Sequence, residues 1–381
     1  MYSLKTMNAT WMKTLLEGGK DPNIWEMNLV GTHHSAILWN DLDTSDSIES
    51  QFGKYKIATT LFPFIIRSWT ACQDYTVFEQ LEMGVRYLSL DLSFTNNAFY
   101  VTHSFRGPLL TTVLNQIAKF YDKYGTSEVI LLRAMADSEN EKTLHGREAE
   151  LMQVFKNHKV SKYYTNHTNQ RLFLKLSEYG DQPLIPLFDY KIQRGNVGHP
   201  NYYFRKWYNA NTNKKLFERM ETGFNFVKNQ NISDISVLQS ILTPDTSEII
   251  SGVILWIYFI VLAICITGIA IIFSVKHDQL NPFSTFLRTH VASTVFLSIF
   301  AFIILAFSIA MIVLRPAINI KRLSINTKNE FLQKSKGRPY NVVLVDFVNP
   351  DFVQKVIALN DKEESVEIQL SVPSKPSTAV K

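Results

Sequence analysis

Cysteine is scarce in this chain, with two residues in 381, Cys72 and Cys265. Cys265 lies inside a long apolar run, so the two are not expected to pair, and a disulfide-stapled scaffold is excluded. With 15 glycines and 13 prolines, the chain also has too little of either residue for a collagen-like or low-complexity protein. Residues 1–20 are polar and mixed and lack the apolar core of a secretory signal peptide, so none is predicted.

Charge is absent from two long stretches, 249–275 and 291–314. As helices, they would measure about 40 and about 36 Å, which exceeds the ~30 Å hydrocarbon core of a bilayer. The connection between them, 276–290, is short. We therefore predict a transmembrane hairpin that crosses a bilayer twice; the alternative is a pair of buried core helices.

Such a hairpin would make this a multi-pass membrane protein with the chain before and after it on the same side. Lys and Arg are more frequent in the flank after the second run than in the connecting loop, which places both flanks, and with them the main globular part, in the cytoplasm. Gly268 and nearby small residues would allow homo-oligomers to form through the hairpin.

The excess of positive charge is confined to one segment. Lys and Arg total 39 and Asp and Glu 34, a net charge of +5, and residues 315–338 alone carry seven basic side chains and one acid. This segment is either a solvated linker or a contact for anionic lipid, which would add about 1 kcal/mol per basic residue near the membrane surface. The rest of the chain has no basic stripe, so nucleic-acid binding is not expected.

Outside the apolar runs, the chain alternates between short β-rich runs and helical stretches. Thr76 and Glu79 form the capping box of a predicted helix that ends at Gly84, and residues 109–124 have the apolar spacing of another. Alternation of this kind predicts a parallel sheet or barrel. The predicted strands are 26–31, 85–92, 99–103, 128–133, 171–176 and 341–347.

The last predicted strand follows the apolar hairpin, so the hairpin is expected as an insertion within one domain. We predict an α/β fold, a complete or incomplete TIM-type barrel, with residues 1–247 as its main part. The transmembrane hairpin would occupy 248–314. Residues 315–360 would supply a basic linker and the final strand and helix, and 361–381 would form a disordered tail.

Histidines and one carboxylate follow the ends of the predicted strands. His33 and His34 come after the first strand, His103 ends the third, and Asp346 ends the last. The carboxyl ends of parallel barrel strands meet at the active site, so these side chains are expected to converge there. Two imidazoles suit general acid–base catalysis because they titrate near neutral pH. A buried Asp346 could orient one ring and favour its charged form.

Short motifs follow one another along the chain: LVGTHHS at 29–35, Cys72-Gln73, EQLEMGVRYL at 79–88, VTHS at 101–104, WYNANT at 207–212, LTP at 242–244, NVVLVDFV at 341–348 and VIALN at 356–360. In this order they resemble the X domain of phosphatidylinositol-specific phospholipase C, and most closely the small X-domain-containing proteins that lack the other phospholipase modules. The resemblance covers about 25–247 and 337–360.

The resemblance implies a distorted, incomplete TIM-type barrel and cleavage of a phosphodiester in an inositol lipid. On the family pattern His33 is the general base that deprotonates the inositol 2-hydroxyl, which attacks phosphorus and yields a 1,2-cyclic inositol phosphate. His103 is the general acid that protonates the diacylglycerol leaving oxygen, and Asp346 supports the first histidine. The expected function is therefore that of a membrane-anchored phosphoric diester hydrolase acting on a phosphatidylinositol-type lipid.

The chain departs from the family pattern at the polar positions that would surround the phosphate. His34 stands where the family has Asp or Asn, and Ser89 stands where an acid is expected. Asp91, on the same strand face as Ser89, resembles the calcium-dependent version, but the other acids of a calcium cage are not recognisable. Calcium therefore stays open as a cofactor, and Arg133 could supply the positive charge instead. His34, Asp91 and Arg133 are thus candidate substrate- or metal-binding residues.

Two other functions compete with this one. A catalytically inactive X-domain module could bind phosphoinositides or act as a membrane scaffold; Ser89 and His34 favour it, whereas His33, His103 and Asp346 favour the enzyme. A glycerophosphodiester hydrolase is disfavoured because the His-Arg-Gly and Glu-rich metal pattern that it needs is absent from the sequence.

Overall fold

A single mixed sheet organises the chain. The computed structural model describes residues 8–47, 63–136, 146–164, 174–188, 203–205, 210–229, 235–243 and 340–361, with isolated positions between 258 and 333. The ten strands run in the order β2-β5-β4-β3-β1-β10-β9-β8, with β6 paired to β3 and β7 to β6. Their bounds are β1 Leu29–Thr32, β2 Asp43–Ser47, β3 Tyr87–Thr95, β4 Ala98–His103, β5 Phe105–Leu109, β6 Ile130–Ala136, β7 Leu184–Phe188, β8 Tyr203–Arg205, β9 Ile235–Ser240 and β10 Val342–Val345.

The parallel strands form a curved wall in the order β7-β6-β3-β1-β10-β9-β8. Within the described residues no pairing joins β7 to β8, so this ring of strands is open on that side. The second half of β3 leaves the wall and pairs antiparallel with β4, which continues through β5 to β2. Neighbours β1 and β10 come from opposite ends of the chain, so the last described strand completes the centre of the sheet.

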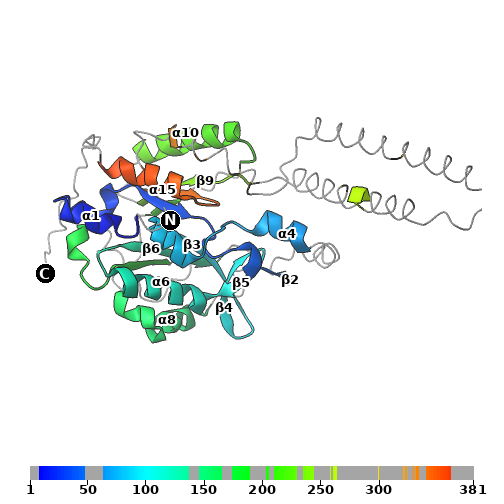
Figure 1. The fold of residues 1–381 in the computed structure, drawn as a ribbon, viewed down its shortest axis with the longest axis horizontal. Helices are drawn as coiled ribbons and strands as arrows, with labels where there is room; N and C mark the ends of the chain where they lie inside the picture. Colours follow the sequence, from blue (N-terminus) through cyan, green and yellow to red (C-terminus); the bar gives the residue numbers. More distant parts are fainter. Residues whose placement is uncertain are drawn as a thin grey trace, which may run out of the picture.

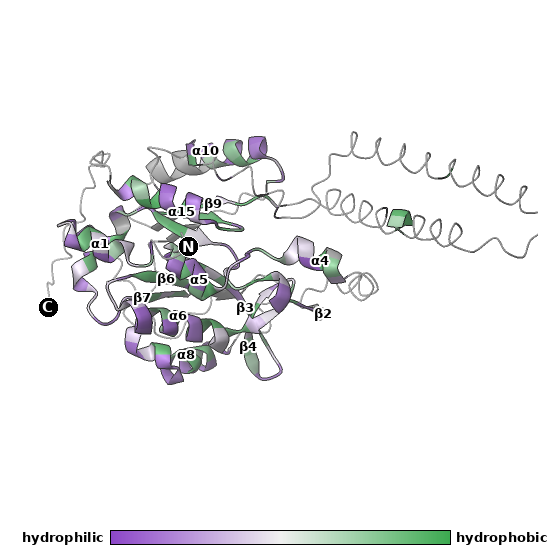
Figure 2. Cartoon of the chain, in the orientation of Figure 1, coloured by the Kyte–Doolittle hydropathy of each residue, from purple (hydrophilic) through white to green (hydrophobic). Residues whose placement is uncertain are grey.

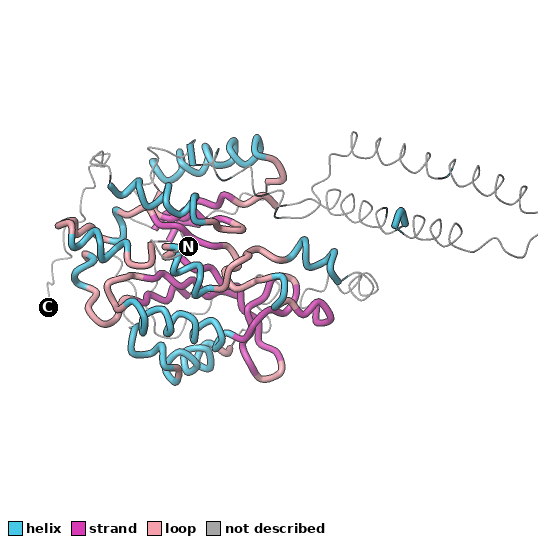
Figure 3. Tube along the Cα trace, in the orientation of Figure 1, coloured by secondary structure: helices cyan, strands magenta, loops and turns pink. Residues whose placement is uncertain are grey.

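Helices cover the strands on both sides. In Figures 1 and 3, α6 and α8 lie on one side of the strands and α10 and α15 on the other. The predicted helix after Thr76 is confirmed, because the Thr76 and Glu79 side chains each accept the other's backbone N–H and Gly84 ends the helix with a φ of 112°. The helices are α1 Trp11–Glu17, α4 Pro63–Thr70, α5 Val77–Met83, α6 Leu110–Tyr124, α8 Glu148–Asn157, α10 Asn213–Asn229 and α15 Pro350–Ile357.

Alternate residues of the parallel strands point into the barrel, and the lower part of its interior is apolar. Tyr87 of β3, Leu131 of β6 and Leu344 of β10 all belong to one buried cluster that α1 also joins. The interior is tightly filled, since a Cβ on Gly31 would lie 2.8 Å from Tyr87 Cδ1 and 2.9 Å from a methyl group of Val342. This packing leaves only the upper end of the barrel for polar side chains.

The opposite faces of the same strands pack against the helices. Leu88 and Leu90 of β3 and Val343 of β10 lie in a second buried cluster together with residues of α5 and α6. Figure 2 shows the corresponding pattern, with mostly hydrophobic strands and helices whose polar residues lie on one side. The α6 sequence has this amphipathic spacing, which explains why a charged helix such as α6 can cover the sheet.

A buried ion pair holds the N-terminal helix against the bottom of the barrel. Arg86 donates from Nε and Nη2 to Glu128, at 2.9 and 2.5 Å, and also donates to the carbonyl of Ala9. Glu128 in turn accepts from the backbone N–H groups of Met12 and Lys13. Nη1 of Arg86 donates to the carbonyls of Leu81 and Val85, so the buried pair joins residues 8–13 to α5 and to the residues that precede β3.

The prediction of a transmembrane hairpin is wrong for this structure. Among the described residues no helix combines the length and the apolar character that crossing a bilayer requires. The longest described helix, α10, has 17 residues, or about 25 Å, and carries several charges. Almost all of 249–275 and 291–314 lies outside the described residues. An uncharged run permits a spanning helix but does not require one. We therefore withdraw the hairpin from the predicted fold class. The two predictions that depended on the hairpin, a two-span membrane localisation and oligomerisation, are withdrawn with it.

The predicted and observed elements also differ outside the apolar runs. The predicted strand at 171–176 is wrong where it can be checked, because residues Leu176–Glu178 form a 3-10 helix that continues from a bridge at Lys175. The predicted disordered tail, apart from Asp361, lies outside the described residues. The strands β2, β5, β7, β8 and β9 were not predicted. The sequence of β2 is wholly polar, and the others are short and carry no clear alternation of apolar and polar residues.

Candidate functional site

Polar side chains occupy the upper end of the barrel interior, directly above the apolar packing. Inward-facing positions on β3 continue from Tyr87 to Ser89 and Asp91, and those on β6 continue from Leu131 to Arg133. Ser89 and Arg133 are direct cross-strand partners. Because every second residue of a strand points inward, the lining of the interior changes from apolar to polar between two successive inward positions of β3 and of β6.

His33 and Asp346 meet where β1 and β10 end side by side. Nδ1 of His33 lies 2.9 Å from Oδ1 of Asp346, whose side chain is completely buried. Burial raises the pKa of the Asp346 carboxyl to about 7, against the opposing pull of the His103 ring and the Lys328 ammonium. The contact uses Nδ1 of His33, which leaves Nε2 for another partner.

Gln73 fixes this pair of strand ends. Its Nε2 donates to the carbonyl oxygens of His33, at 2.9 Å, and of Val345, at 3.1 Å, while its Oε1 accepts from the N–H of Val348. The side chain is buried. Sequence reasoning noted Gln73 only as part of a motif and assigned it no role, because nothing local to residue 73 indicates contact with residues 33 and 345.

His103 reaches the same place from the antiparallel strand β4. Its Nδ1 donates to the carbonyl of Thr70 at 2.8 Å, since a carbonyl can only accept. Nε2 of His103 is then the nitrogen without a proton in the neutral ring. The ring centroids of His33 and His103 lie 6.0 Å apart.

His34 fills the space between these two rings. Its centroid lies 4.0 Å from that of His33 and 3.9 Å from that of His103, stacked on the latter with 24° between the planes. Burial, and then the neighbouring His103 and His33 rings, hold the pKa of His34 well below its usual value. The ring is thus neutral at neutral pH. Its role as a substrate- or metal-binding residue, predicted from the sequence, stays a prediction.

The backbone is strained at three positions next to His33, His103 and Asp346. His34, Ser104 and Phe347 all adopt positive φ values, 40°, 60° and 46°. Each follows the end of a strand that carries a site residue. Non-glycine residues avoid this conformation unless the surrounding structure imposes it, and such positions concentrate at functional sites.

Arg133 provides the positive charge of the site. Its Nη1 donates to Ser89 Oγ at 2.6 Å and to Asp91 Oδ1 at 3.0 Å, and its side chain is almost fully buried. The other oxygen of Asp91 lies 3.6 Å from Nδ1 of His34. Arg133 therefore faces inward and links β6 to the histidines through Asp91.

The residues around Asp91 do not suit calcium. Calcium takes six to eight oxygen ligands, whereas in the described residues Asp91 has a guanidinium and an imidazole as its neighbours. The described residues that could together hold a metal ion are His33, Cys72 and Asp346. Their mixed nitrogen, sulfur and oxygen donors are not the set that calcium prefers.

All six residues singled out from the sequence lie in this one site. His33, His34, His103 and Asp346 form one group, and Asp91 with Arg133 borders it through His34. Sequence reasoning missed Cys72, whose Sγ lies 3.4 Å from Nδ1 of His103. The motif Cys72-Gln73 was the only available signal, and it indicated resemblance rather than position.

The basic segment 315–338 contributes a second residue that was missed. Lys328 is buried and donates to the carbonyl of Phe347, next to Asp346. Burial lowers the pKa of Lys328 to about 8. Lys321 forms an ion pair with Asp74 at 2.6 Å. These two lysines face the protein, and the other five basic residues of the segment lie outside the described residues, so the predicted contact with anionic lipid stays a prediction.

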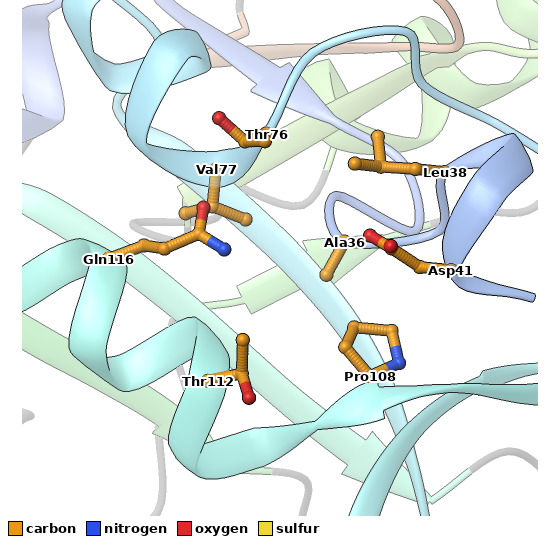
Figure 4. Close-up of a pocket in the computed structure, with 8 residues that line it drawn as sticks. All are labelled: Ala36, Leu38, Asp41, Thr76, Val77, Pro108, Thr112 and Gln116. Carbon is orange, nitrogen blue, oxygen red and sulfur yellow. The ribbon is translucent and has the colours of Figure 1, made fainter.

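A cavity of about 190 Å³ is lined by residues of the loop after β1, of α5 and of α6. Figure 4 shows it between the loop after β1, the start of α5 and the start of α6, with Asp41 and Gln116 pointing toward one another across it. Burial raises the pKa of Asp41. None of the six site residues lines this cavity, so it is a feature separate from the polar end of the barrel.

Comparison with known proteins points to one family. No protein-family model matches the chain. A PI-PLC X-box domain-containing protein from Dictyostelium discoideum is 24% identical over 174 residues, which are 45% of this chain and 21% of that relative. The match therefore spans about a fifth of the relative's length.

Solved structures of phosphatidylinositol-specific phospholipases C have a similar fold. The phosphatidylinositol-specific phospholipase C from Listeria monocytogenes covers 92% of this chain and 98% of its own, with a TM-score of 0.50 and 14% identity. The enzyme of the same name from S. aureus covers 93% and 98%, with a TM-score of 0.52 and 14% identity. At this identity the likeness concerns the fold alone. Together, the curated relative and the solved folds confirm the resemblance of this chain to the phosphatidylinositol-specific phospholipase C X-domain family.

Proposed function

We propose that the chain is a phosphoric diester hydrolase of the phospholipase C type, which cleaves an inositol phospholipid into diacylglycerol and a cyclic inositol phosphate. The observation that carries the proposal is the arrangement of His33 and His103, two imidazoles with centroids 6.0 Å apart, each held through Nδ1. Each ring is oriented by its Nδ1 contact, and we assign the proton transfers that a base and an acid carry out to the two Nε2 atoms.

The reaction follows from these two nitrogens. Nε2 of His33 accepts the proton of the inositol 2-hydroxyl, and the 2-oxygen forms a bond to phosphorus. The bond from phosphorus to the diacylglycerol oxygen breaks, and protonated His103 gives its Nε2 proton to that oxygen. The products are diacylglycerol and a 1,2-cyclic inositol phosphate. His33 gains one proton and His103 loses one, so the number of protons is unchanged.

Asp346 and Arg133 support the charge changes. The carboxylate of Asp346 stabilises His33 when it becomes an imidazolium. The guanidinium of Arg133, held by Ser89 and Asp91 at the same end of the barrel, is placed to offset the negative charge that grows on the phosphate oxygens in the transition state. We infer that turnover depends on this cation and not on calcium.

The test uses the purified full-length chain with phosphatidylinositol vesicles and detects cyclic inositol phosphate with calcium and with a chelator. Product from the wild type that disappears in His33→Ala and in His103→Ala, and that the chelator does not affect, supports the proposal. Product that survives in either variant contradicts the assigned roles.

One observation favours an inactive binding module as the second candidate. The His34 ring packs against both catalytic rings, tilted against His33 and stacked on His103, and so reduces the room for a phosphate beside them. The same vesicle experiment separates the candidates, because a module would sediment with phosphatidylinositol vesicles without releasing any cyclic phosphate.

A further inference from the structure

The proposed reaction does not use Cys72, although this residue lies among the groups that the reaction does use. A nitrogen of His33, the sulfur of Cys72 and a carboxylate oxygen of Asp346 all lie within 4.8 Å of one another. Around a tetrahedral zinc ion, with bonds of about 2.0–2.3 Å, ligand atoms are separated by roughly 3.3–3.7 Å. Small side-chain shifts would therefore bring all three atoms onto one ion.

Asp346 gives an independent indication of a missing partner. Its Oδ2 is buried and has no nitrogen or oxygen donor within hydrogen-bond distance in the described part of the chain. The side chain that does interact with this carboxyl is the Cys72 thiol, which is a weak donor. Buried carboxylate oxygens are normally paired with a stronger donor or with an ion, because leaving one without a partner costs about 1–3 kcal/mol.

We propose that His33, Cys72 and Asp346 form a binding site for a soft divalent cation of the zinc class. The charges favour such an ion, since a thiolate and a carboxylate together neutralise one dication inside a buried site. The donors exclude the harder cations, because thiolate and imidazole select zinc over calcium and magnesium. On binding, the Cys72 thiol releases its proton to solvent and the hydrogen bond between His33 and Asp346 is replaced by two bonds to the ion.

Such a site would be inhibitory, and this part rests on the proposed function. An ion bound to the His33 ring and to Asp346 takes both away from proton transfer with the inositol hydroxyl. Zinc should then stop turnover at concentrations that fill the site, and a chelator should restore it. If calcium were instead required for turnover, a chelator would stop turnover rather than restore it.

The binding is tested without reference to activity. Cobalt(II) replaces zinc in tetrahedral sites and shows a strong near-ultraviolet band when a thiolate is a ligand. The full-length wild type titrated with cobalt(II) should show this band, and added zinc should abolish it. Cys72→Ser should remove the band, whereas Cys265→Ser, a matched change at the other cysteine, should leave it in place. Asp346→Asn should weaken cobalt binding by tenfold or more.

The outcomes separate the two proposals. Absence of the band from the wild type, or its loss in Cys265→Ser but not in Cys72→Ser, overturns the metal site whatever the vesicle assay shows. The band without any vesicle turnover supports the metal site and contradicts the enzyme. Turnover that zinc does not inhibit, in a protein that shows the band, overturns the inhibitory role.

Discussion

Nδ1 of His33 lies 2.9 Å from Oδ1 of Asp346, although 313 positions separate the two residues in the chain. The contact exists because β1 and β10 are parallel neighbours and end at the same level, with Thr32 opposite Val345. Gln73 holds both ends with its side-chain amide. The pair is therefore a product of the sheet order, and its chemistry can be tested by changing one residue at a time.

Replacing Asp346 should separate catalysis from stability. Its pKa is about 7 in the folded chain and 3.8 in the unfolded one, so between these pH values the unfolded state binds fewer protons. The stability contribution of this group is thus present in full below about pH 4 and is lost as pH rises through about 7. Asp346→Asn should remove a cost of up to about 4 kcal/mol at high pH, while turnover falls by about 10²-fold or more.

Urea unfolding at about pH 5 and about pH 8, beside the vesicle assay, measures both effects. The variant should be at least as stable as the wild type at the higher pH, and the difference should shrink at the lower pH. A variant that is equally destabilised at both pH values would show that Asp346 is an ordinary structural carboxyl.

Arg133→Ala should reduce turnover by about 10²–10³-fold, the usual effect of removing one group that stabilises transition-state charge. Calcium should not restore activity, because Ser89 and Asp91 alone do not make a calcium cage. The matched control is Arg106→Ala, which removes another arginine in an ion pair, with Asp43 at 2.5 Å, on the strand β5, which carries none of the six site residues. Comparable losses from the two changes would assign the effect to general destabilisation rather than to the phosphate.

His34→Asn should be tolerated and should increase turnover. Asn accepts the positive φ of 40° found at this position, and the change removes the ring stacked between His33 and His103. We expect a several-fold rise in kcat/KM for phosphatidylinositol vesicles and little change in Tm. His34→Val, a β-branched residue at the same φ, should destabilise by about 1–2 kcal/mol. A fall in kcat/KM for the Asn variant would show that the His34 ring assists the reaction.

Gln73→Leu should cost stability and activity together. The change removes three hydrogen bonds, to the His33 and Val345 carbonyls and from the Val348 N–H. The Val345 carbonyl keeps the backbone N–H of His33 as a donor, so the expected loss is about 2–4 kcal/mol. Turnover should fall further than stability requires, since His33 would lose its fixed position. Gln153→Leu on the exposed surface of α8 is the control, and equal unfolding midpoints for the two variants would contradict this role for Gln73.

The sequence alone was sufficient where the governing pattern is local. The capping box needs only two residues three positions apart, Thr76 and Glu79, and it predicted α5 because backbone N–H groups at a helix start require such partners. The period of two put Ser89 and Asp91 on one face of β3. Strand ends marked His33, His103 and Asp346, because polar residues after apolar runs are visible without any tertiary information.

Local pattern failed where the tertiary structure sets the outcome. The uncharged runs at 249–275 and 291–314 suggested spanning helices, but lack of charge over a given length is only one condition for such a helix. The inward direction of Arg133, the position of the His34 ring and the arrival of Lys328 beside Asp346 depend on strand pairing and on contacts between residues far apart in the chain. Cys72 next to His103 is of the same kind, since 31 positions separate them. The separation of two residues along the chain does not predict such contacts. They arise only when the strand ends and loops pack together at the end of the barrel.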